Sequence, residues 1–237
     1  MLQIKNLSVK VGEKQILNQI SFDFEIGKNY CILGKNGSGK SSLAMTLAGN
    51  PKYEISEGEL LLDGQNLTEM TPDERNKAGI FLTFQNIPEI PGVKLFEFLK
   101  TIYDARAEKP STFLEFKKII EPLMAELEIE KAFLWRDLNV GFSGGEKRKI
   151  EVLQIKLLKP KYIILDEIDS GLDVNAVRQV AELLKAVNTE ENSFIVITHL
   201  FEMLQELPLE KILILEQGKI KAIGGRELME QVRKEGF

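Results

Sequence analysis

Cysteine is nearly missing from this chain, which has only Cys31 among its 237 residues. A disulfide framework is therefore excluded, and we do not expect this chain alone to hold a cysteine-ligated metal or iron–sulfur cluster. No apolar run approaches the roughly 18 residues that a membrane span needs, so we expect no direct insertion into a membrane. The first residues lack the apolar stretch of a signal peptide, which favours a cytoplasmic protein.

An excess of basic charge is also missing. The chain has 31 Lys+Arg against 36 Asp+Glu, a formal net charge of −5. A mildly acidic chain has no general attraction for nucleic acid or anionic lipid, so we expect no nucleic-acid partner. Hydrophobic residues make up 43% of the sequence, enough for a core without covalent staples. These values fit a globular protein of one or two domains.

The hydrophobic pattern predicts an α/β fold. Apolar residues two apart over residues 20–26 indicate a strand with one buried face. Apolar residues three or four apart over 174–187 indicate a helix, and residues 212–220 indicate a hairpin. Four continuous apolar runs are typical of strands in a parallel sheet, which are covered on both faces. These runs are residues 30–33, 80–84, 162–165 and 194–198.

A helical segment interrupts this alternation of strands and helices. The pattern is helical from about residue 95 to 138, where Thr112 and Glu115 have the spacing of a capping box. Pro122 is expected to kink this helix or to begin another. We therefore expect one domain, 1–237, with an all-helical subdomain inserted in its α/β body. The expected bounds are 1–90 and 141–237 for the body and 91–140 for the insert.

The residues Gly34–Ser41 match the phosphate-binding pattern G-x-x-x-x-G-K-[ST]. They follow an apolar run and precede a helical stretch, the context that this pattern requires. Its glycines let backbone N–H groups point at phosphate oxygens, and the helix N-terminus adds positive potential. An incidental glycine-rich loop is the alternative, which an eight-residue match in this context disfavours. The nucleotide-binding residues predicted here are Gly34, Lys35, Asn36, Gly37, Ser38, Gly39, Lys40, Ser41 and Ser42.

Two acidic residues, Asp166 and Glu167, end the apolar run 162–165. Open α/β sheets place their ligands at the carboxyl ends of their strands. We expect Asp166 and the Ser41 hydroxyl to bind Mg²⁺, and Glu167 to orient or deprotonate an attacking water. The alternative, a pair of surface acids where a strand meets a loop, loses to this interpretation because the chain also has a phosphate loop.

A second anion site is predicted at Ser143–Glu146. Ser143 and Glu146 have the spacing of a capping box, so a helix is expected to begin here. Gly144 and Gly145 in its first turn are a poor choice for stability alone. They leave backbone N–H groups exposed, which suits an anion at a helix N-terminus.

These motifs, with residues 170–173, together resemble the ABC-type ATPases over nearly the whole chain and in the same order. The resemblance implies a P-loop NTPase fold with a mixed, largely parallel core sheet and an N-terminal antiparallel part. It implies ATP and Mg²⁺ as cofactors and a nucleotide-dependent, head-to-tail homodimer. Each ATP would lie between the phosphate loop of one copy and Ser143, Gly144, Gly145 and Glu146 of the other.

The same resemblance implies roles for three more residues. Gln85 matches the glutamine that contacts Mg²⁺ and the attacking water, Asp173 matches an aspartate at the dimer seam, and His199 matches the catalytic switch histidine. Taken singly, they also fit a solvated loop residue, a turn and a capping residue. The sequence departs from the family at Val9 and Val11, where an aromatic residue usually stacks on adenine. Contact with the base is therefore expected to be aliphatic.

Several local strings are more specific and resemble the SufC group, the soluble ATPases of SUF iron–sulfur cluster assembly. The most distinctive are Glu89–Gly92 and the Phe142–Glu146 form of the signature. This resemblance implies SufB and SufD scaffold proteins as partners. Independently of the resemblance, we expect the partner to dock near the insert, beside Gln85–Val93, because that segment joins the nucleotide to the insert. The alternatives are the motor subunit of an ABC membrane transporter, with the same fold, and a non-catalytic nucleotide-dependent clamp. Glu167 and His199 argue against the clamp.

Overall fold

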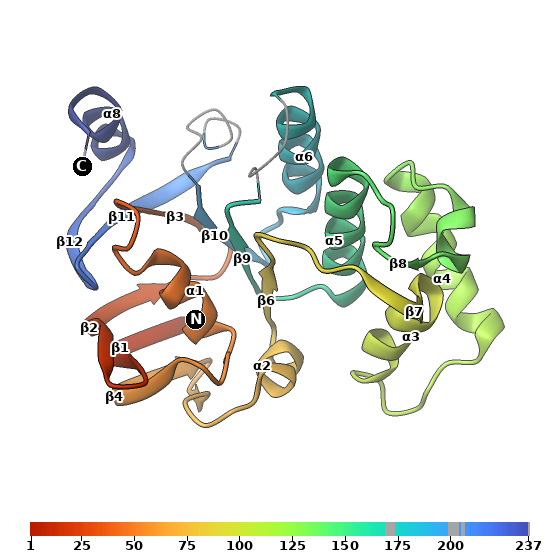
Figure 1. Ribbon diagram of the computed structural model, residues 1–237, viewed down its shortest axis with the longest axis horizontal. Coiled ribbons are helices and arrows are strands. Elements are labelled where there is room, and N and C mark those ends of the chain that lie inside the picture. Colours follow the sequence, from red (N-terminus) through yellow and green to blue (C-terminus); the bar gives the residue numbers. More distant parts are fainter. Residues whose placement is uncertain (169–173, 199–203, 205–206, 237) are drawn as a thin grey trace. The chain divides into compact units, whose positions relative to one another are not determined.

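The computed structural model describes residues 1–168, 174–198, 204 and 207–236 (Figure 1). The chain divides into two compact units. The sheet unit comprises Met1–Thr83, Pro160–Ile168 and Asn188–Phe237, and the helical unit comprises Phe84–Lys159 and Asp169–Val187. The expected insert, 91–140, falls within the helical unit, and its status as a separate subdomain stays a prediction.

A six-stranded sheet forms the centre of the sheet unit, in the order β12-β11-β3-β10-β9-β6. All neighbours pair in parallel except β12, which pairs antiparallel with β11. Every residue of β3, β9 and β10 is buried, as the continuous apolar runs predicted. The strands are β3 (Asn29–Leu33), β6 (Ile80–Thr83), β9 (Tyr162–Asp166), β10 (Ser193–Ile197), β11 (Leu209–Glu216) and β12 (Lys219–Gly224).

A smaller antiparallel sheet has the order β2-β1-β4-β5. Its strands are β1 (Leu2–Val11), β2 (Lys14–Phe24), β4 (Glu54–Leu62) and β5 (Gln65–Asn66). Strand β2 confirms the predicted alternation but ends at Phe24, and Ile26 beyond it is 42% exposed. Helix α1 (Lys40–Leu47) packs between the two sheets (Figure 1).

The hydroxyl of Tyr162 ties the two sheets together. It accepts a hydrogen bond from the Leu2 amide (3.0 Å) and donates one to the Phe24 carbonyl (2.8 Å). Leu2, Phe24 and Tyr162 are all fully buried and belong to the core shared by both sheets and α1. Cys31 is also fully buried, and burial raises the pKa of its thiol, which confirms it as a core residue.

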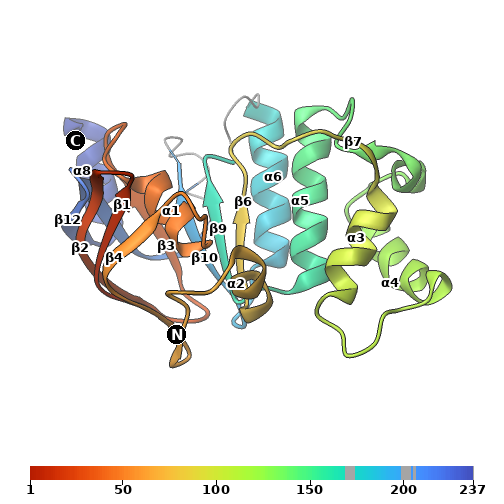
Figure 2. The same ribbon diagram turned by 60° about the horizontal axis from the view of Figure 1, so that its bottom comes forward.

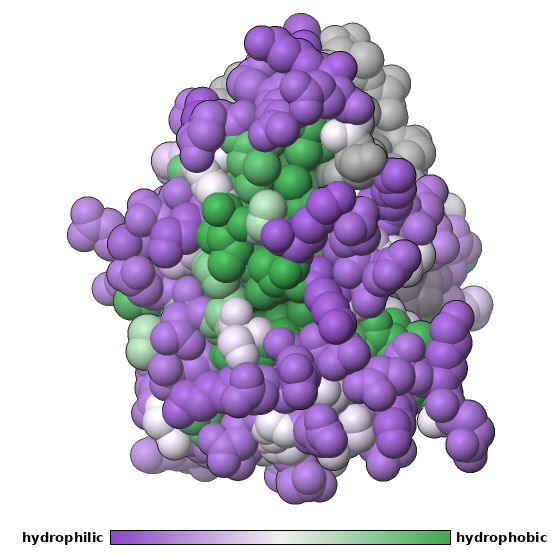
Figure 3. Space-filling view, turned by 90° about the vertical axis from the view of Figure 1, so that its left-hand side faces the viewer, coloured by the Kyte–Doolittle hydropathy of each residue, from purple (hydrophilic) through white to green (hydrophobic). Residues whose placement is uncertain are grey.

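Two short helices complete the sheet unit, α2 (Pro72–Ala78) and α8 (Arg226–Glu235), and α8 packs on the β11–β12 hairpin. Strand β12 is an edge strand, and the exposed Lys219 and Lys221 on it disfavour pairing with another chain. Figure 3 shows the face of the sheet unit on this side, where an apolar area is bordered by polar side chains.

The helical unit contains α3 (Leu95–Asp104), α4 (Phe113–Glu126), α5 (Gly144–Leu158) and α6 (Val174–Val187), and α5 packs beside α6 (Figure 2). A 3₁₀ helix, η1 (Lys131–Trp135), and a small sheet of β7 (Ile90–Lys94) with β8 (Asp137–Leu138) complete it. The expectation of helix throughout 95–138 was therefore wrong at its C-terminal end, where β8 lies.

Helix α4 begins at the predicted capping box: Thr112 Oγ1 accepts from the Glu115 amide, and Glu115 Oε2 accepts from the Thr112 amide. The helix then runs on through Pro122, so no new helix begins there. A proline in a helix leaves the carbonyl four residues earlier without its partner. Here both Pro122 and Lys118, whose carbonyl is the one concerned, are exposed.

Candidate functional site

The phosphate loop leaves β3 at Leu33 and enters α1 at Lys40. The residue before the helix, Gly39, has φ +108°, a left-handed backbone that glycine adopts without strain. No side chain of residues 1–168, 174–198, 204 or 207–236 caps α1. The amides of its first turn are thus left for an external acceptor, and phosphate oxygens suit that position.

Lys40 holds the two ends of this loop together. Its buried ammonium donates to the carbonyls of Gly34 (2.8 Å) and Lys35 (3.2 Å). Burial lowers the pKa of Lys40, and the nearby charges of Glu167 and Asp166 oppose that shift. The loop is thus curved around a single buried cation, as a phosphate-binding site requires.

Ser38 supplies a second sign of an anion ligand. Its Oγ is buried and, within the described part of the chain, forms no hydrogen bond. Buried hydroxyls are normally paired, so an orphaned one inside a phosphate loop fits a phosphate oxygen as its partner. The residues present therefore fit the phosphate groups of a nucleotide.

Asp166 is the last residue of β9 and Glu167 follows it, at the same edge of the sheet. In the strand order β3-β10-β9, all three strands run parallel, so their carboxyl ends lie together. The Ser41 hydroxyl donates to Asp166 Oδ1 at 3.2 Å, which brings residues from two distant motifs into contact. A hydroxyl and a carboxylate oxygen side by side suit a hard cation such as Mg²⁺.

The two acids differ in their surroundings. Asp166 is 2% exposed, and burial raises its pKa, as does the Glu167 charge, while the Ser41 bond opposes the shift. Glu167 is half-buried and has φ +48°, a left-handed conformation that costs energy for a residue with a Cβ. Its amide donates to the Ile197 carbonyl of β10 (2.8 Å), which fixes this backbone.

The turn of the β11–β12 hairpin is hydrogen-bonded to the phosphate loop and supports it. The Gly218 amide donates to the Ser38 carbonyl (2.9 Å), and the Gly218 carbonyl accepts from the Asn18 amide (2.9 Å). Gly218 has φ +74°, and a Cβ there would lie 2.2 Å from the Ile16 carbonyl oxygen. The pattern predicted the hairpin but not this support, because a contact across some 180 residues leaves no local signal.

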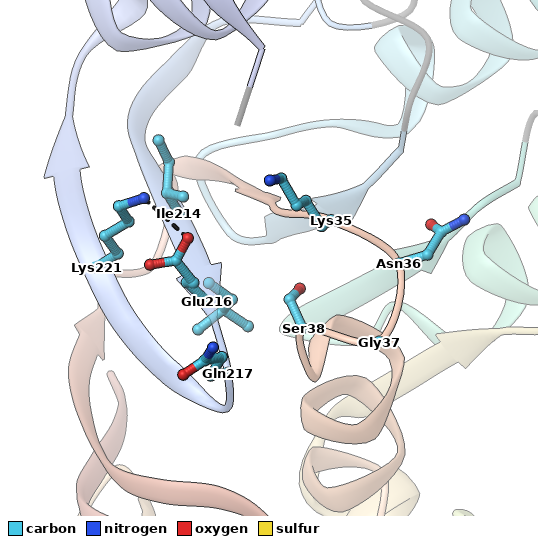
Figure 4. Close-up of a pocket in the computed structure, with 9 residues that line it drawn as sticks. Lys35, Asn36, Gly37, Ser38, Ile214, Glu216, Gln217 and Lys221 are labelled. Carbon is cyan, nitrogen blue, oxygen red and sulfur yellow. Dashed lines mark hydrogen bonds and ion pairs between the residues drawn. The ribbon is translucent and has the colours of Figure 1, made fainter.

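A cavity of about 250 Å³ lies between the phosphate loop and this hairpin (Figure 4). On one wall of this cavity, the Lys221 ammonium donates a hydrogen bond to Glu216 Oε1 (2.9 Å). The lining residues are Lys35, Asn36, Gly37, Ser38, Ile214, Leu215, Glu216, Gln217 and Lys221.

The second predicted anion site is in the helical unit, at the start of α5. Ser143 Oγ accepts from the Glu146 amide (3.3 Å), and Glu146 Oε2 accepts from the Ser143 amide (2.7 Å), which confirms the capping box. The bond from the Ser143 amide lowers the pKa of Glu146. Among the described residues, a Cβ at Gly145 would meet nothing within 4 Å, so packing against them does not require glycine there.

The remaining predicted residues are less completely described. Gln85 belongs to the helical unit, and its carbonyl accepts from Arg148 at 3.2 Å. Asp173 and His199 lie outside the described residues. Val9 is fully buried and Val11 is half-buried at the end of β1, so of the two only Val11 has exposed surface. An aliphatic contact with the base stays a prediction.

A strand, phosphate loop and helix, with acids at the end of a parallel strand nearby, define a P-loop nucleoside triphosphatase. The model of the family described as "ABC transporter" matches residues 17–170. The chain therefore belongs to the ABC transporter family, of which it is an ATPase domain.

Curated relatives match over the full chain. A probable ATP-dependent transporter, ycf16, of Antithamnion sp. is 42% identical and 96% covered. The probable ATP-dependent transporter slr0075 of Synechocystis sp. is 41% identical and 94% covered. The probable ATP-dependent transporter SufC of Escherichia coli is 39% identical and 97% covered. Each alignment covers 100% of this chain.

Solved structures confirm the predicted fold class. The ATP-binding cassette MJ0796, in a dimer bound to ADP and Pi, has a TM-score of 0.80 at 23% identity, with 94% of this chain and 98% of that chain covered. The ADP conformation of the cassette MJ1267 has a TM-score of 0.80 at 22% identity, with 99% and 95% covered. In the part of the chain that the structure describes, no helix has the length and apolar character to cross a membrane.

Proposed function

We propose that this chain is a cytoplasmic ATPase of iron–sulfur cluster assembly, which hydrolyses MgATP in a head-to-tail dimer to remodel a SufB/SufD-type scaffold. The observation that carries the proposal is the 39% identity to SufC over the full chain, together with the SufC-like strings 88–93 and 142–146. A single buried cysteine agrees with it, because the cluster would then be carried by the scaffold.

The predicted catalytic and metal-binding residues would each have a role in hydrolysis. Lys40 binds the β- and γ-phosphates, and Ser41, Asp166 and Gln85 would hold Mg²⁺, which when bound neutralises charge on those phosphates. Glu167 orients the attacking water and accepts its proton. The bond from the Glu167 amide to Ile197 keeps the carboxylate in place during this step. His199 contacts the γ-phosphate.

The dimer follows from the signature at the start of α5. Gly144 and Gly145 lower helix propensity by about 1 kcal/mol each relative to alanine, and packing against the residues that the structure describes does not require glycine at 145. A ligand held by a second copy supplies a reason for them. Ser143 and these glycines would bind the phosphates of the partner copy's ATP, and Asp173 would lie at the seam. The free energy of ATP binding then stabilises the dimer, and hydrolysis of the ATP removes that stabilisation.

The proposed docking site for the scaffold is the segment Gln85–Val93. Three apolar side chains in or beside it are exposed: Phe84 is 49%, Ile90 37% and Val93 36% exposed. Apolar side chains of this size on one short segment suit a protein partner. Crosslinks to a SufB/SufD-type scaffold should therefore map here, and crosslinks confined to residues 215–237 would contradict this site.

A second candidate function uses the same site with another partner. The relatives from Antithamnion, Synechocystis and Escherichia coli are named probable ATP-dependent transporters. A motor subunit of an ABC membrane transporter is therefore the alternative. Copurification from the native cell decides between these two functions. An ATPase of cluster assembly should copurify with a pair of scaffold proteins, and a transporter subunit with a multi-spanning membrane protein.

The Glu167→Gln variant tests the catalytic site and the dimer together. It keeps the shape of Glu167 but cannot accept a proton, so it should bind ATP, stop turning over and accumulate as a dimer. Light scattering after gel filtration with ATP and Mg²⁺ measures this. The double variant Lys40→Ala/Glu167→Gln is the control and should stay monomeric. A Glu167→Gln protein that stays monomeric in excess ATP and Mg²⁺ contradicts the shared site.

A further inference from the structure

An ion pair is buried on α5, one turn after the signature. Arg148 and Glu151 lie three residues apart, with Arg148 Nη1 2.6 Å from Glu151 Oε2, and their side chains are 4% and 5% exposed. Charged side chains are rarely buried to this extent. This pair therefore calls for a reason beyond the helix on which it lies.

Both side chains also bind the backbone of Phe84 and Gln85. Glu151 Oε1 accepts from the Phe84 amide (2.9 Å), and Arg148 donates to the carbonyls of Phe84 (2.8 Å) and Gln85 (3.2 Å). Strand β6 ends at Thr83, so these backbone groups lie beyond its paired residues. They are partly buried, and the ion pair supplies hydrogen-bond partners for them.

Two more links join the following residues to the same region. Asn139 Nδ2 donates to the Pro88 carbonyl (2.9 Å), and Lys147 forms an ion pair with Glu89 (2.8 Å). Residues 84–89 are thus bonded to the start of α5 and to the loop before it. This is also the helix that begins at Ser143.

Stability alone does not account for such a pair. Burying two charges costs desolvation energy, and well-packed apolar residues often replace a buried ion pair without loss. Burial indeed raises the pKa of Glu151, although Arg148 opposes the shift. What apolar side chains cannot do is hold three backbone groups of Phe84 and Gln85 in one geometry.

We infer that Arg148 and Glu151 are positioning residues, which hold the Gln85 loop on the signature helix so that the two move as one body. The inference rests on the proposed roles of Gln85 and Ser143. A nucleotide that contacts Gln85 in one copy would then set the position of the signature which that copy offers to the other. The pair itself contacts no nucleotide and acts through the backbone of Phe84 and Gln85.

The test uses a paired substitution, because removing one charge alone leaves the other buried and can unfold the protein. In Arg148→Met/Glu151→Leu the buried volume is filled, but the bonds to Phe84 and Gln85 are gone. The matched control is Lys156→Met/Glu126→Leu, which removes an ion pair between α5 and α4 away from residues 84–89. Both variants are checked for an unchanged cooperative unfolding transition.

Two measurements on the full chain decide the outcome. Hydrogen exchange of the Phe84 amide should be at least about tenfold faster in the Arg148/Glu151 variant and unchanged in the control. The kcat for ATP should fall roughly 10- to 100-fold with KM changed less than about twofold, since a small misplacement at a reacting centre costs that much. Unchanged exchange, or unchanged kcat in a protein whose Gln85→Ala variant is slow, overturns the inference.

The Gln85→Ala variant separates this inference from the proposed function. If Gln85→Ala keeps the wild-type kcat, the proposed role of Gln85 is wrong, and the exchange of the Phe84 amide still tests whether the ion pair holds this loop. A structural pair without a positioning role would instead give full activity in any variant that folds.

Discussion

We expect nucleotide binding to depend on Lys40 more than on any other residue. Its ammonium spans the loop between the carbonyls of Gly34 and Lys35 and lies in the electrostatic field of both acids. In Lys40→Ala that charge is lost, and we expect ATP affinity to fall by at least about 100-fold, as for a charged contact worth about 3 kcal/mol. Titration with a fluorescent ATP analogue measures this, with Lys52→Ala as the control. Near-native affinity in Lys40→Ala would place the phosphates elsewhere.

Tyr162 should contribute to stability and not to catalysis. Tyr162→Phe leaves the Leu2 amide and the Phe24 carbonyl without partners in the core, a loss of about 1–3 kcal/mol. Burial raises the pKa of Tyr162 to about 12, so the loss should not vary between pH 6 and 9. Urea unfolding measures it, and the half-buried Tyr53→Phe should cost less. An equal cost for the two would contradict the linking role of this hydroxyl.

Residue roles could be predicted wherever a local pattern carries them. The phosphate-binding pattern singles out Lys40 and Ser41, and the end of an apolar run in a chain with that pattern singles out Asp166. The structure places Ser41 against Asp166, and the roles of all three stay predictions. The sequence did not reveal Gly218 or the Arg148–Glu151 pair, because their partners are distant along the chain. A bond such as Gly218 to Ser38 depends on the register of a hairpin against the loop, which no local spacing encodes.

At the scale of elements, the chain offers two matched helix caps. Thr112–Glu115 begins α4 and Ser143–Glu146 begins α5, with the same pair of reciprocal bonds. Thr112→Ala and Ser143→Ala should each cost about 1 kcal/mol of unfolding free energy. Only Ser143→Ala should also slow ATP hydrolysis, because that cap is proposed to bind the other copy's nucleotide.

Denaturant unfolding and phosphate release, measured on both cap variants, test this prediction. Equal losses of activity would mean that Ser143 acts only through the stability of α5. A loss confined to Ser143→Ala at matched stability would agree with a nucleotide contact.

Elements were predicted well where burial gives the sequence a regular hydrophobic pattern. Strands β3, β9 and β10 contain continuous apolar runs because both of their faces are buried, and β2 alternates because one face is. The region after α4 was predicted less well. The two residues of β8 are too few to show a period, and the five residues of η1 are too few to separate a 3₁₀ helix from an α-helix by their spacing.

At the scale of the whole molecule, activity should depend on protein concentration. If each ATP lies between two copies, a dilute chain spends more time as an inactive monomer. Specific activity for phosphate release, measured over about a hundredfold dilution at saturating ATP and Mg²⁺, should therefore fall. A covalently linked tandem of two copies is the control and should resist dilution. A single chain that keeps full activity at every concentration would contradict the shared pocket.

The Gly218 turn has a consequence for genetic screens. Any side chain at this position strikes the Ile16 carbonyl, and the hairpin can then no longer support Ser38. Substitutions of Gly218 should therefore resemble null alleles at Lys40, although Gly218 touches no substrate. A deep mutational scan would give Gly218 and Lys40 the same loss of activity. From the scan alone, Gly218 would be mistaken for a catalytic residue, although its role is to support the loop.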